Sequence, residues 1–285
     1  MNIFITGING FIANHLACFL SKQGHTIYGS TSKLNTKAFD ENVVKQVYSL
    51  QFLEPIDKKL FQEMDMIIHC AHDFERGALK KNTQGTLAIA EVARQQGVTK
   101  QIFISSLSAR PDAITEYGKA KYETERYFLQ HNGIIVRSGT VLGREGIFGK
   151  IVGLMKKFPA LPLLDGGKSQ MYLIGIMDLC KSISLILNRE GPLEFNLYYS
   201  EKHTLRTVLT LMKILLQRNV LLIPLPAVLF IWPLEALKRM GVRLPIDVDN
   251  LKGFAKSQKT IHHSDLKTIM ESAISLESTL KESFM

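Results

Sequence analysis

The strongest constraint on the fold lies at the start of the chain, where a short apolar run meets a glycine turn and then a helical pattern. The apolar run Ile3–Ile5 is typical of a buried parallel strand, Gly7 ends it, and a helical pattern begins at Phe11. Gly7 permits a tight turn, Gly10 allows a ligand to approach the backbone, and Ala13 is small enough for helix and strand to pack closely. Backbone N–H groups at the start of this helix would then point toward a position suited to a pyrophosphate.

Strand and helix patterns alternate through the first half of the chain. The expected strands cover residues 2–5, 25–30, 44–48, 64–70, 101–105 and 134–137, and the expected helices cover 11–22, 79–96 and 117–131. This alternation predicts an α/β fold, a Rossmann-type doubly wound parallel sheet with helices on both faces. Beyond it, helices are expected at 148–157, 178–188, 204–217, 226–240 and 264–275, with one more strand at 194–199.

These patterns suggest two parts within the 285 residues. We expect residues 1–165 to form a dinucleotide-binding Rossmann domain. Residues 166–285 would form a smaller, mostly helical substrate lobe, from which the segment at about 170–200 returns to the Rossmann sheet.

The end of the second expected strand bears on the choice of dinucleotide. Thr31, Ser32 and Lys33 follow this strand, and no acidic residue occurs until Asp40. A carboxylate at this position binds the ribose 2′-hydroxyl of NAD, whereas hydroxyls and a cation suit a 2′-phosphate. The sequence therefore favours NADP over NAD, with the alternative that Lys33 is an ordinary solvated lysine.

Composition excludes several other classes of protein. The chain carries 35 Lys and Arg against 26 Asp and Glu, a net charge of +9, which suits anionic small molecules, but no basic block or basic-aromatic pattern indicates nucleic-acid binding. Its 3 cysteines are widely spaced and indicate neither a disulfide framework nor a metal site. A cytoplasmic location is expected. The apolar tract Val220–Pro233 is too short to span a bilayer, and a helix packed in the second lobe is favoured over a peripheral membrane contact.

Two histidines flank the end of the fourth expected strand. His69 and His72 occur on either side of Ala71, and neither has an Asp or Glu at helical spacing. A structural role is therefore favoured over a catalytic one.

One pair of side chains indicates a proton-transfer chemistry. Tyr117 and Lys121 are four residues apart in an expected helix, so both emerge on one face. A tyrosine ordinarily ionises near pH 10, and a neighbouring ammonium would lower that value toward a useful range. Ser106, at the end of the preceding strand, could orient a substrate oxygen.

The order of these motifs resembles the extended short-chain dehydrogenase/reductase superfamily, the NAD(P)-dependent epimerases and dehydratases. The matching pieces include Thr6-Gly7-x-x-Gly10-Phe11-Ile12, Ile68-His69-Cys70-Ala71, Asn82-x-x-Gly85-Thr86, Phe103-Ile104-Ser105-Ser106, Tyr117-x-x-x-Lys121, Val136-Arg137-Ser138-Gly139 and Asp178-Leu179. They run in order through about the first 190 residues, which is more specific than any single motif.

The resemblance implies a role for each matching residue. Tyr117 would be the catalytic acid/base, Lys121 would tune it and hold the cofactor, and Ser106 would position the substrate. The cofactor-binding residues would be Gly7, Asn9, Gly10, Phe11, Ile12, Thr31, Ser32, Lys33, Ala71, Asn82 and Lys121, with no metal.

The resemblance also implies a reaction and its partners. The expected activity is an oxidoreductase or epimerase reaction at a carbinol or carbonyl carbon, with an anionic nucleotide-linked sugar as substrate. Dehydration ranks low, because no acidic pair accompanies Ser106. The resemblance further suggests a homodimer. The alternative is an NAD(P)-binding scaffold or sensor in which catalysis has been lost or is incidental.

Overall fold

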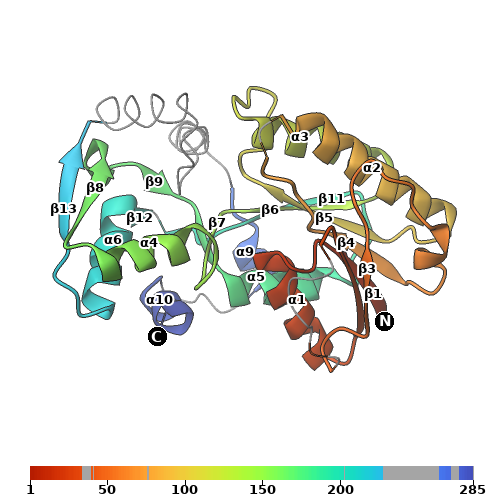
Figure 1. The fold of residues 1–285 in the computed structure, drawn as a ribbon, viewed down its shortest axis with the longest axis horizontal. Helices are drawn as coiled ribbons and strands as arrows, with labels where there is room; N and C mark the ends of the chain where they lie inside the picture. The colour runs from red at the N-terminus through yellow and green to blue at the C-terminus, as the bar shows by residue number, and fades with distance from the viewer. Residues whose placement is uncertain are drawn as a thin grey trace. The chain divides into compact units, whose positions relative to one another are not determined.

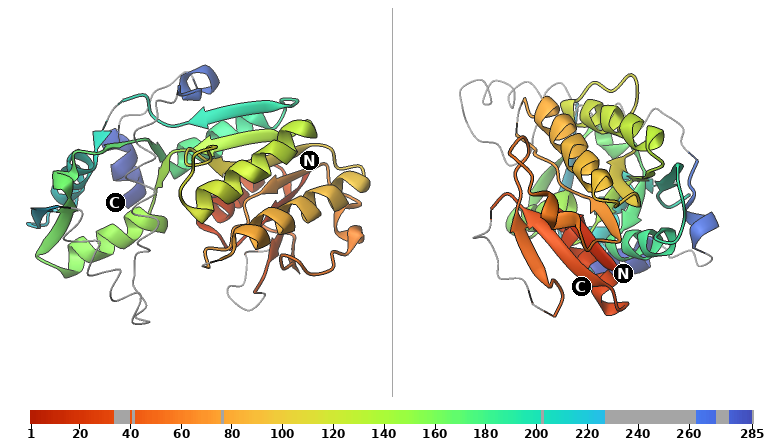
Figure 2. Two further views of the ribbon diagram at one scale, coloured as in Figure 1. Left: turned by 90° about the horizontal axis from the view of Figure 1, so that it is seen from above. Right: turned by 90° about the vertical axis from the view of Figure 1, so that its right-hand side faces the viewer.

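The computed structural model of the chain describes residues 1–33, 40, 42–75, 77–201, 203–226, 263–270 and 276–284 (Figures 1 and 2). Residues divide between two units by their contacts. Unit 1 consists of Met1–Ser138 and Ile176–Leu197, and unit 2 consists of Gly139–Gly175 and Tyr198–Met285. The boundaries of these units differ from the expected division at residue 165. A substrate-binding role for unit 2 stays a prediction.

A seven-stranded parallel sheet forms the centre of unit 1, in the order β11-β6-β5-β4-β1-β2-β3. Its strands are β1 (Asn2–Thr6), β2 (Thr26–Thr31), β3 (Gln46–Ser49), β4 (Met66–His69), β5 (Gln101–Ser106), β6 (Ile134–Ser138) and β11 (Leu193–Leu197). Every residue of β4 is buried, which is expected of a central strand covered on both faces. The predicted Rossmann-type sheet is confirmed, and β11 is the returning strand at its edge.

Helices cover both faces of this sheet. They are α1 (Phe11–Lys22), α2 (Leu79–Gln95), α3 (Glu116–Gln130) and α5 (Ile176–Ile186), with a short 3₁₀ turn η1 (Lys58–Phe61) before β4. Helix α2 packs beside α3 and α1 packs beside α5, one pair on each face (Figure 1). Each helix therefore buries its apolar side against the sheet and leaves its polar side in water.

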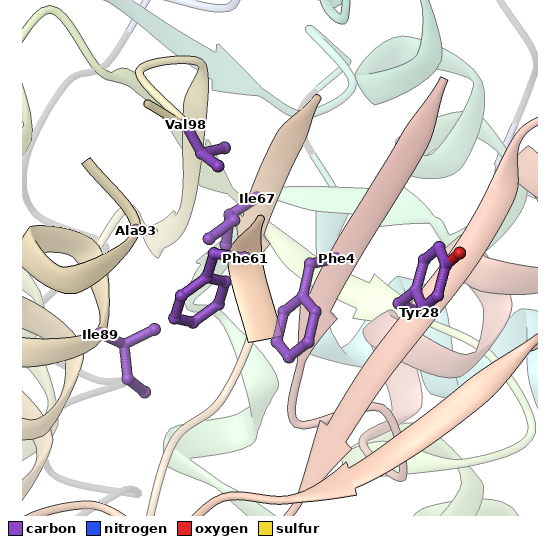
Figure 3. Packing of buried hydrophobic residues seen from close by; sticks show 7 residues of the cluster. All are labelled: Phe4, Tyr28, Phe61, Ile67, Ile89, Ala93 and Val98. Atoms are coloured by element: carbon purple, nitrogen blue, oxygen red, sulfur yellow. The ribbon is translucent and has the colours of Figure 1, made fainter. Parts of the chain in front are cut away.

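The core beneath α2 is built from aromatic and aliphatic side chains of several elements. Figure 3 shows seven of its buried residues: Phe4, Tyr28, Phe61, Ile67, Ile89, Ala93 and Val98. The rings of Phe4 and Phe61 meet edge to face, with centroids 5.2 Å apart. Burying side chains of this size is worth about 1.5–3 kcal/mol each, so η1 is held to the sheet by its Phe61.

The strand order reverses between β1 and β4, and this reversal decides where a ligand can bind. Chain connections leave the sheet in opposite directions from these two neighbouring strands, β1 toward β2 and β4 toward β5. In open parallel sheets such a switch point opens a crevice at the carboxyl ends of the strands. The residues that follow Thr6 and His69 therefore border the expected crevice.

Unit 2 contains short strands in pairs. Parallel pairs join β7 (Thr140–Leu142) to β10 (Leu173–Gly175) and β8 (Ala160–Leu164) to β13 (Leu221–Leu225), and an antiparallel pair joins β9 (Gln170–Met171) to β12 (His203–Thr204). The unit also contains η2 (Asp165–Gly167) and the helices α4 (Gly146–Lys157), α6 (Leu205–Leu215), α9 (Leu266–Ile269) and α10 (Leu276–Phe284). The sequence patterns had predicted mostly helices here, because strands this short show no clear alternation.

The interpretation of Val220–Pro233 as a helix is wrong for its described part. Leu221–Leu225 is strand β13, paired along its whole length with β8. Pro224 is compatible with this pairing because, among the strands that the structure describes, β13 pairs with β8 alone, so the missing N–H can face away from β8. The expected helix at 226–240 lies outside the described residues, and of the helix at 264–275 the structure describes α9 alone.

No helix in the described part of the chain is both long enough and apolar enough to cross a bilayer.

Candidate active site

The glycine turn after β1 lies directly against the end of β4. Gly7 has a φ of +67°, a backbone conformation that side chains disfavour. A Cβ atom at Gly7 would lie 2.7 Å from the Cα of Ala71, closer than atoms can approach. The hydroxyl oxygen of Thr6 accepts hydrogen bonds from the backbone N–H groups of Cys70 and Ala71, both at 3.1 Å. The two strands bordering the switch point are thus locked together.

The helix that follows the turn presents an open N-terminus. Gly10 is the N-cap of α1, has no side chain to cap the helix, and is followed by no acidic residue in the first turn. Gly10 is exposed, whereas Phe11 and Ile12 are half-buried. The first N–H groups of a helix lack partners within it and attract anions. The predicted diphosphate contacts of this turn match that geometry.

The residues at the end of β2 differ in burial. Thr31 is buried, and its hydroxyl oxygen accepts from Asn9 Nδ2 at 2.8 Å and from the backbone N–H of Lys33 at 3.2 Å. Ser32 and Lys33 are exposed. Thr31 and Asn9 therefore hold the two loops together, while cofactor binding by the exposed Ser32 and Lys33 stays a prediction.

Asn82 holds the loop between β4 and α2. Its Nδ2 donates to the carbonyl oxygens of Asp73 at 2.8 Å and Ala78 at 2.9 Å, and its Oδ1 accepts from the N–H of Asp73 at 2.7 Å. Lys81 pairs with the Asp73 carboxylate at 2.5 Å. Both amide donors of Asn82 are thus used within the protein, so its effect on a cofactor would pass through the loop it holds.

Ser106 and Tyr117 meet where β5 ends and α3 begins. Thr115 caps α3 by accepting a hydrogen bond from the N–H of Gly118 at 3.1 Å, which places Tyr117 in the first turn. The Ser106 side chain hydrogen-bonds Tyr117 and also lies 2.7 Å from the hydroxyl of Ser108. The structure therefore brings together the predicted serine and tyrosine.

Lys121 is buried one turn further along α3. Its Nζ donates to the carbonyl oxygen of Ile104 at 2.7 Å and lies 4.5 Å from the ring centroid of Phe103 and 5.9 Å from that of Tyr117. Burial lowers the pKa of Lys121 to about 8, because the ammonium has lost most of its hydration.

The pKa of Tyr117 moves opposite to the prediction. Burial raises it above the ordinary value of a phenol, and the hydrogen bond with Ser106 offsets part of this rise. The ammonium of Lys121 is directed to the carbonyl oxygen of Ile104 rather than to the phenol oxygen. Desolvation therefore outweighs the expected effect of the neighbouring cation.

Two rings pack against Tyr117: His72, for which the sequence favoured a structural role, and Phe74, which sequence reasoning missed. The His72 ring meets it edge to face at 4.8 Å between centroids, and the Phe74 ring lies nearly parallel to it at 6.0 Å. Burial lowers the pKa of His72 to about 3, so the imidazole is neutral at physiological pH. Phe74 is 73% exposed. The position of both residues directly after Ala71 was the available signal, because strand ends border the crevice.

His69 occupies a structural position, as the sequence predicted. It is 1% exposed, its Nε2 is 3.0 Å from Oε1 of Gln101, and its ring meets Phe128 edge to face. Burial lowers its pKa to about 4. This histidine belongs to the core under α3.

Comparison with solved structures gives the same architecture. The chain resembles UDP-glucose 4-epimerase from Thermotoga maritima with UDP-glucose, at a TM-score of 0.77 and 19% identity, covering 99% of this chain and 97% of the other. It resembles UDP-glucuronic acid 4-epimerase from Bacillus cereus in complex with NAD, with a TM-score of 0.73, 17% identity and coverage of 99% and 95%. It also resembles a dTDP-glucose 4,6-dehydratase from Bacillus anthracis in complex with NAD. The TM-score is 0.72 at 15% identity, covering 99% of this chain and 95% of the other. At these identities the likeness establishes the fold.

Comparison of sequences identifies the family. A curated relative from Sinorhizobium fredii, called uncharacterized protein y4nG, is 24% identical over 239 residues, which are 72% of this chain. The chain spans 58% of the length of that relative. The family model for NAD dependent epimerases and dehydratases, a family of enzymes, matches residues 3–197, which include all of unit 1 except its first two residues. With the glycine turn, Ser106, Tyr117 and Lys121 inside that match, the chain belongs to the NAD dependent epimerase/dehydratase family.

Proposed function

We propose that the chain is an NAD(P)-dependent oxidoreductase or epimerase acting on a carbinol or carbonyl carbon of a nucleotide-linked sugar. The observation that carries this proposal is the meeting of Ser106 and Tyr117, with Lys121 one turn away on α3. All three belong to the same unit as the glycine turn that ends β1.

Each of these residues has a defined task in the proposed reaction. Ser106 donates a hydrogen bond to the reacting oxygen and orients it toward the phenol of Tyr117. Tyr117 takes the proton from a hydroxyl group as it becomes a carbonyl, or returns it in the opposite direction. Lys121 places a cation beside the phenol and so favours the phenolate that forms in this step. A bound nicotinamide dinucleotide supplies the redox chemistry at the substrate carbon.

The residues around the switch point fit such a dinucleotide. The closeness of Gly7 to Ala71 leaves no room for a side chain at Gly7, and the uncapped start of α1 leaves N–H groups for the diphosphate. We favour NADP over NAD, because exposed Ser32 and Lys33 follow β2 where a carboxylate would select NAD.

The nucleotide-linked sugar is favoured by charge and by the ligands of similar proteins. The net charge of +9 suits a diphosphate. The similar Thermotoga maritima enzyme was solved with UDP-glucose. In unit 2, the proposed substrate lobe, we name four cations as candidate anchors for the diphosphate: Lys156, Lys157, Lys168 and Arg206.

Titration and turnover measurements test the proposal. Binding of NADPH and NADH is followed by fluorescence, and a panel of nucleotide-sugars is assayed for epimers by NMR and for cofactor oxidation by absorbance. We expect binding of both cofactors, tighter for NADPH, with turnover that is lost in Tyr117→Phe. Full turnover by Tyr117→Phe on an identified substrate would contradict the assigned role.

A second function is favoured by the rings that cover Tyr117. His72 and Phe74 both pack on its ring, and burial raises the pKa of the phenol. These features suit a scaffold or sensor that binds NAD(P) without turnover. Cofactor binding with no product from any sugar in the panel would favour it.

The setting of the protein is proposed as well. We infer a cytoplasmic enzyme and a homodimer formed through α2 and α3. Light scattering on the purified protein gives its mass in solution, and a monomer at micromolar concentration would contradict the dimer.

A further inference from the structure

Three side chains on one face of α3 contact the last three residues of β5. Tyr117, Lys121 and Glu125 follow one another at intervals of four residues, so they form a row along the helix. Tyr117 hydrogen-bonds Ser106, and Lys121 donates to the carbonyl oxygen of Ile104. The third member, Glu125, accepts from the hydroxyl of Ser105 at 2.6 Å.

The carboxylate of Glu125 is buried and accepts hydrogen bonds from side chains of two strands, β5 and β6. It is 1% exposed, and the guanidinium of Arg137 on β6 donates to both of its oxygens, from Nε at 2.8 Å and from Nη2 at 2.7 Å. Arg137 also pairs with Glu194 on β11 at 2.5 Å. These two parallel hydrogen bonds fix both the distance and the orientation of Glu125 relative to Arg137, so they hold α3 at one position on the sheet.

Such a network needs a reason beyond stability. A buried ion pair loses the hydration of both charges, and packed apolar side chains of equal volume would hold a helix to a sheet as well or better. What the ion pair adds is one defined position of α3 along the sheet, because the planar guanidinium of Arg137 matches the Glu125 carboxylate in one arrangement. The register matters here because Ser105 and Ser106 are adjacent, and a shift of α3 would move Tyr117 relative to Ser106.

Glu125 is also a negatively charged neighbour of Lys121 on α3. The rings of Phe103 and Tyr117 and the imidazoles of His69 and His72 near the Lys121 ammonium are neutral at physiological pH. Burial lowers the pKa of Lys121, and two neighbours act in the opposite direction, first Cys70 and then Glu125. Burial raises the pKa of Glu125 itself, against the hydrogen bonds from Arg137 and Ser105.

We propose that Glu125 is a positioning residue for the Tyr117 and Lys121 pair, which it holds in register with β5 through its bonds to Ser105 and Arg137. The expected effect of Glu125 on kcat rests on the proposed function. Its expected effect on the ionisation of Lys121 does not depend on turnover.

The test compares Glu125→Gln with Glu194→Gln. Both variants remove one carboxylate from Arg137, but Glu194 lies on β11 and leaves the hydrogen bond of Ser105 in place. The ionisation of the buried Lys121 is measured by NMR of protein labelled with ¹³C at the lysine side chains, across a pH series. We expect its midpoint to fall by roughly one pH unit in Glu125→Gln, about tenfold in the ionisation constant, and to stay unchanged in Glu194→Gln.

Turnover gives the second readout. In Glu125→Gln we expect kcat to fall about tenfold with KM nearly unchanged, and the alkaline limb of the pH profile to move to lower pH with the Lys121 midpoint. Ser105→Ala keeps the charge of Glu125 and removes its hydrogen bond to β5. This variant should lower kcat about threefold without moving the midpoint.

The outcomes separate the two proposals. An unchanged Lys121 midpoint in folded Glu125→Gln overturns the role of Glu125, whether or not a substrate is known. A shifted midpoint in a protein that turns over no sugar supports it and contradicts the proposed function. If Glu125→Gln does not fold, Ser105→Ala tests the positioning role in its place. A kcat of Ser105→Ala equal to that of the unchanged protein overturns that role.

Discussion

Gly7 and Ala71 lie so close that a single methyl group between them has no space: a Cβ atom on Gly7 would be 2.7 Å from the Cα of Ala71. The first residue begins the turn after β1, and the second follows β4, so their contact joins the ends of the two strands at the switch point. Together they leave bare backbone in the crevice where a dinucleotide is proposed to bind.

Gly7→Ala should damage both the fold and cofactor binding. The positive φ and the overlap with Ala71 together predict a loss of about 1–3 kcal/mol in unfolding free energy. Gly24→Ala is the matched control, because Gly24 also has a positive φ, at +84°, but a Cβ there would meet nothing within 4 Å. Denaturant melts and NADPH titrations of both variants make the comparison. Equal loss of cofactor affinity in the two variants would contradict the role of the contact.

Tyr117→Phe should remove turnover and keep the fold. The phenol is proposed to move a proton, a step worth about 10²–10⁴-fold in rate, so kcat should fall by that range while cofactor binding persists. Tyr127→Phe on the same helix is the control. Its hydroxyl donates to Glu91 at 2.8 Å, away from Ser106, and its loss should leave kcat within about twofold.

Phe74→Ala should weaken substrate binding without weakening the fold. The phenyl ring is 73% exposed and lies parallel to the ring of Tyr117, so it offers an apolar surface to the C–H face of a sugar. We expect KM to rise about tenfold with little change in melting temperature, since an exposed side chain contributes less than about 0.5 kcal/mol. Leu53→Ala, at another exposed apolar residue, should leave KM unchanged.

Ser32→Asp should reverse the preference for cofactor. A carboxylate after β2 would bind a ribose 2′-hydroxyl and repel a 2′-phosphate. We expect the ratio of NADPH affinity to NADH affinity to fall by about tenfold or more, measured by fluorescence titration. Lys33→Ala should lower NADPH affinity alone. A protein that binds both cofactors equally before and after these changes would contradict the assignment of Ser32 and Lys33.

The buried histidine His69 should make the protein sensitive to acid. Its pKa is about 4 in the folded chain against an ordinary 6.5, so between these values the unfolded chain binds more protons. Stability should therefore rise with pH through this window and fall as the pH drops below about 6.5, by at most about 1.4 kcal/mol per pH unit. Denaturant melts at several pH values check this. His69→Gln should reduce the dependence, and the part that remains is expected from His72, whose pKa burial lowers to about 3.

Much of the Rossmann part follows from local patterns. The helix at Phe11–Lys22 begins and ends where expected, because a glycine precedes it and Gly24 follows it closely. Each strand of the sheet in unit 1 was expected within a few residues of its position, since a strand covered on both faces must be a continuous apolar run. Short strands of unit 2 escaped notice because pairs such as β9 and β12 are two residues long.

The proposed site was predictable where its residues are neighbours in sequence. Tyr117 and Lys121 share one helix, so periodicity alone placed them on one face. The position of Asn82 beside a cofactor stays a prediction, and the structure adds that its amide bonds Asp73 and Ala78. The lowering of the Tyr117 pKa was expected from one neighbouring charge, and burial reversed its direction.

The sequence by itself determined the order of strands and helices, the glycine turn, and the spacing of the tyrosine and lysine, because these depend on backbone conformation and on periods of a few residues. Only the tertiary structure decided that Phe74 and His72 cover Tyr117, and that Arg137 reaches Glu125 from another strand. Burial and long-range pairing set those relationships, since both depend on which distant segments the fold brings together.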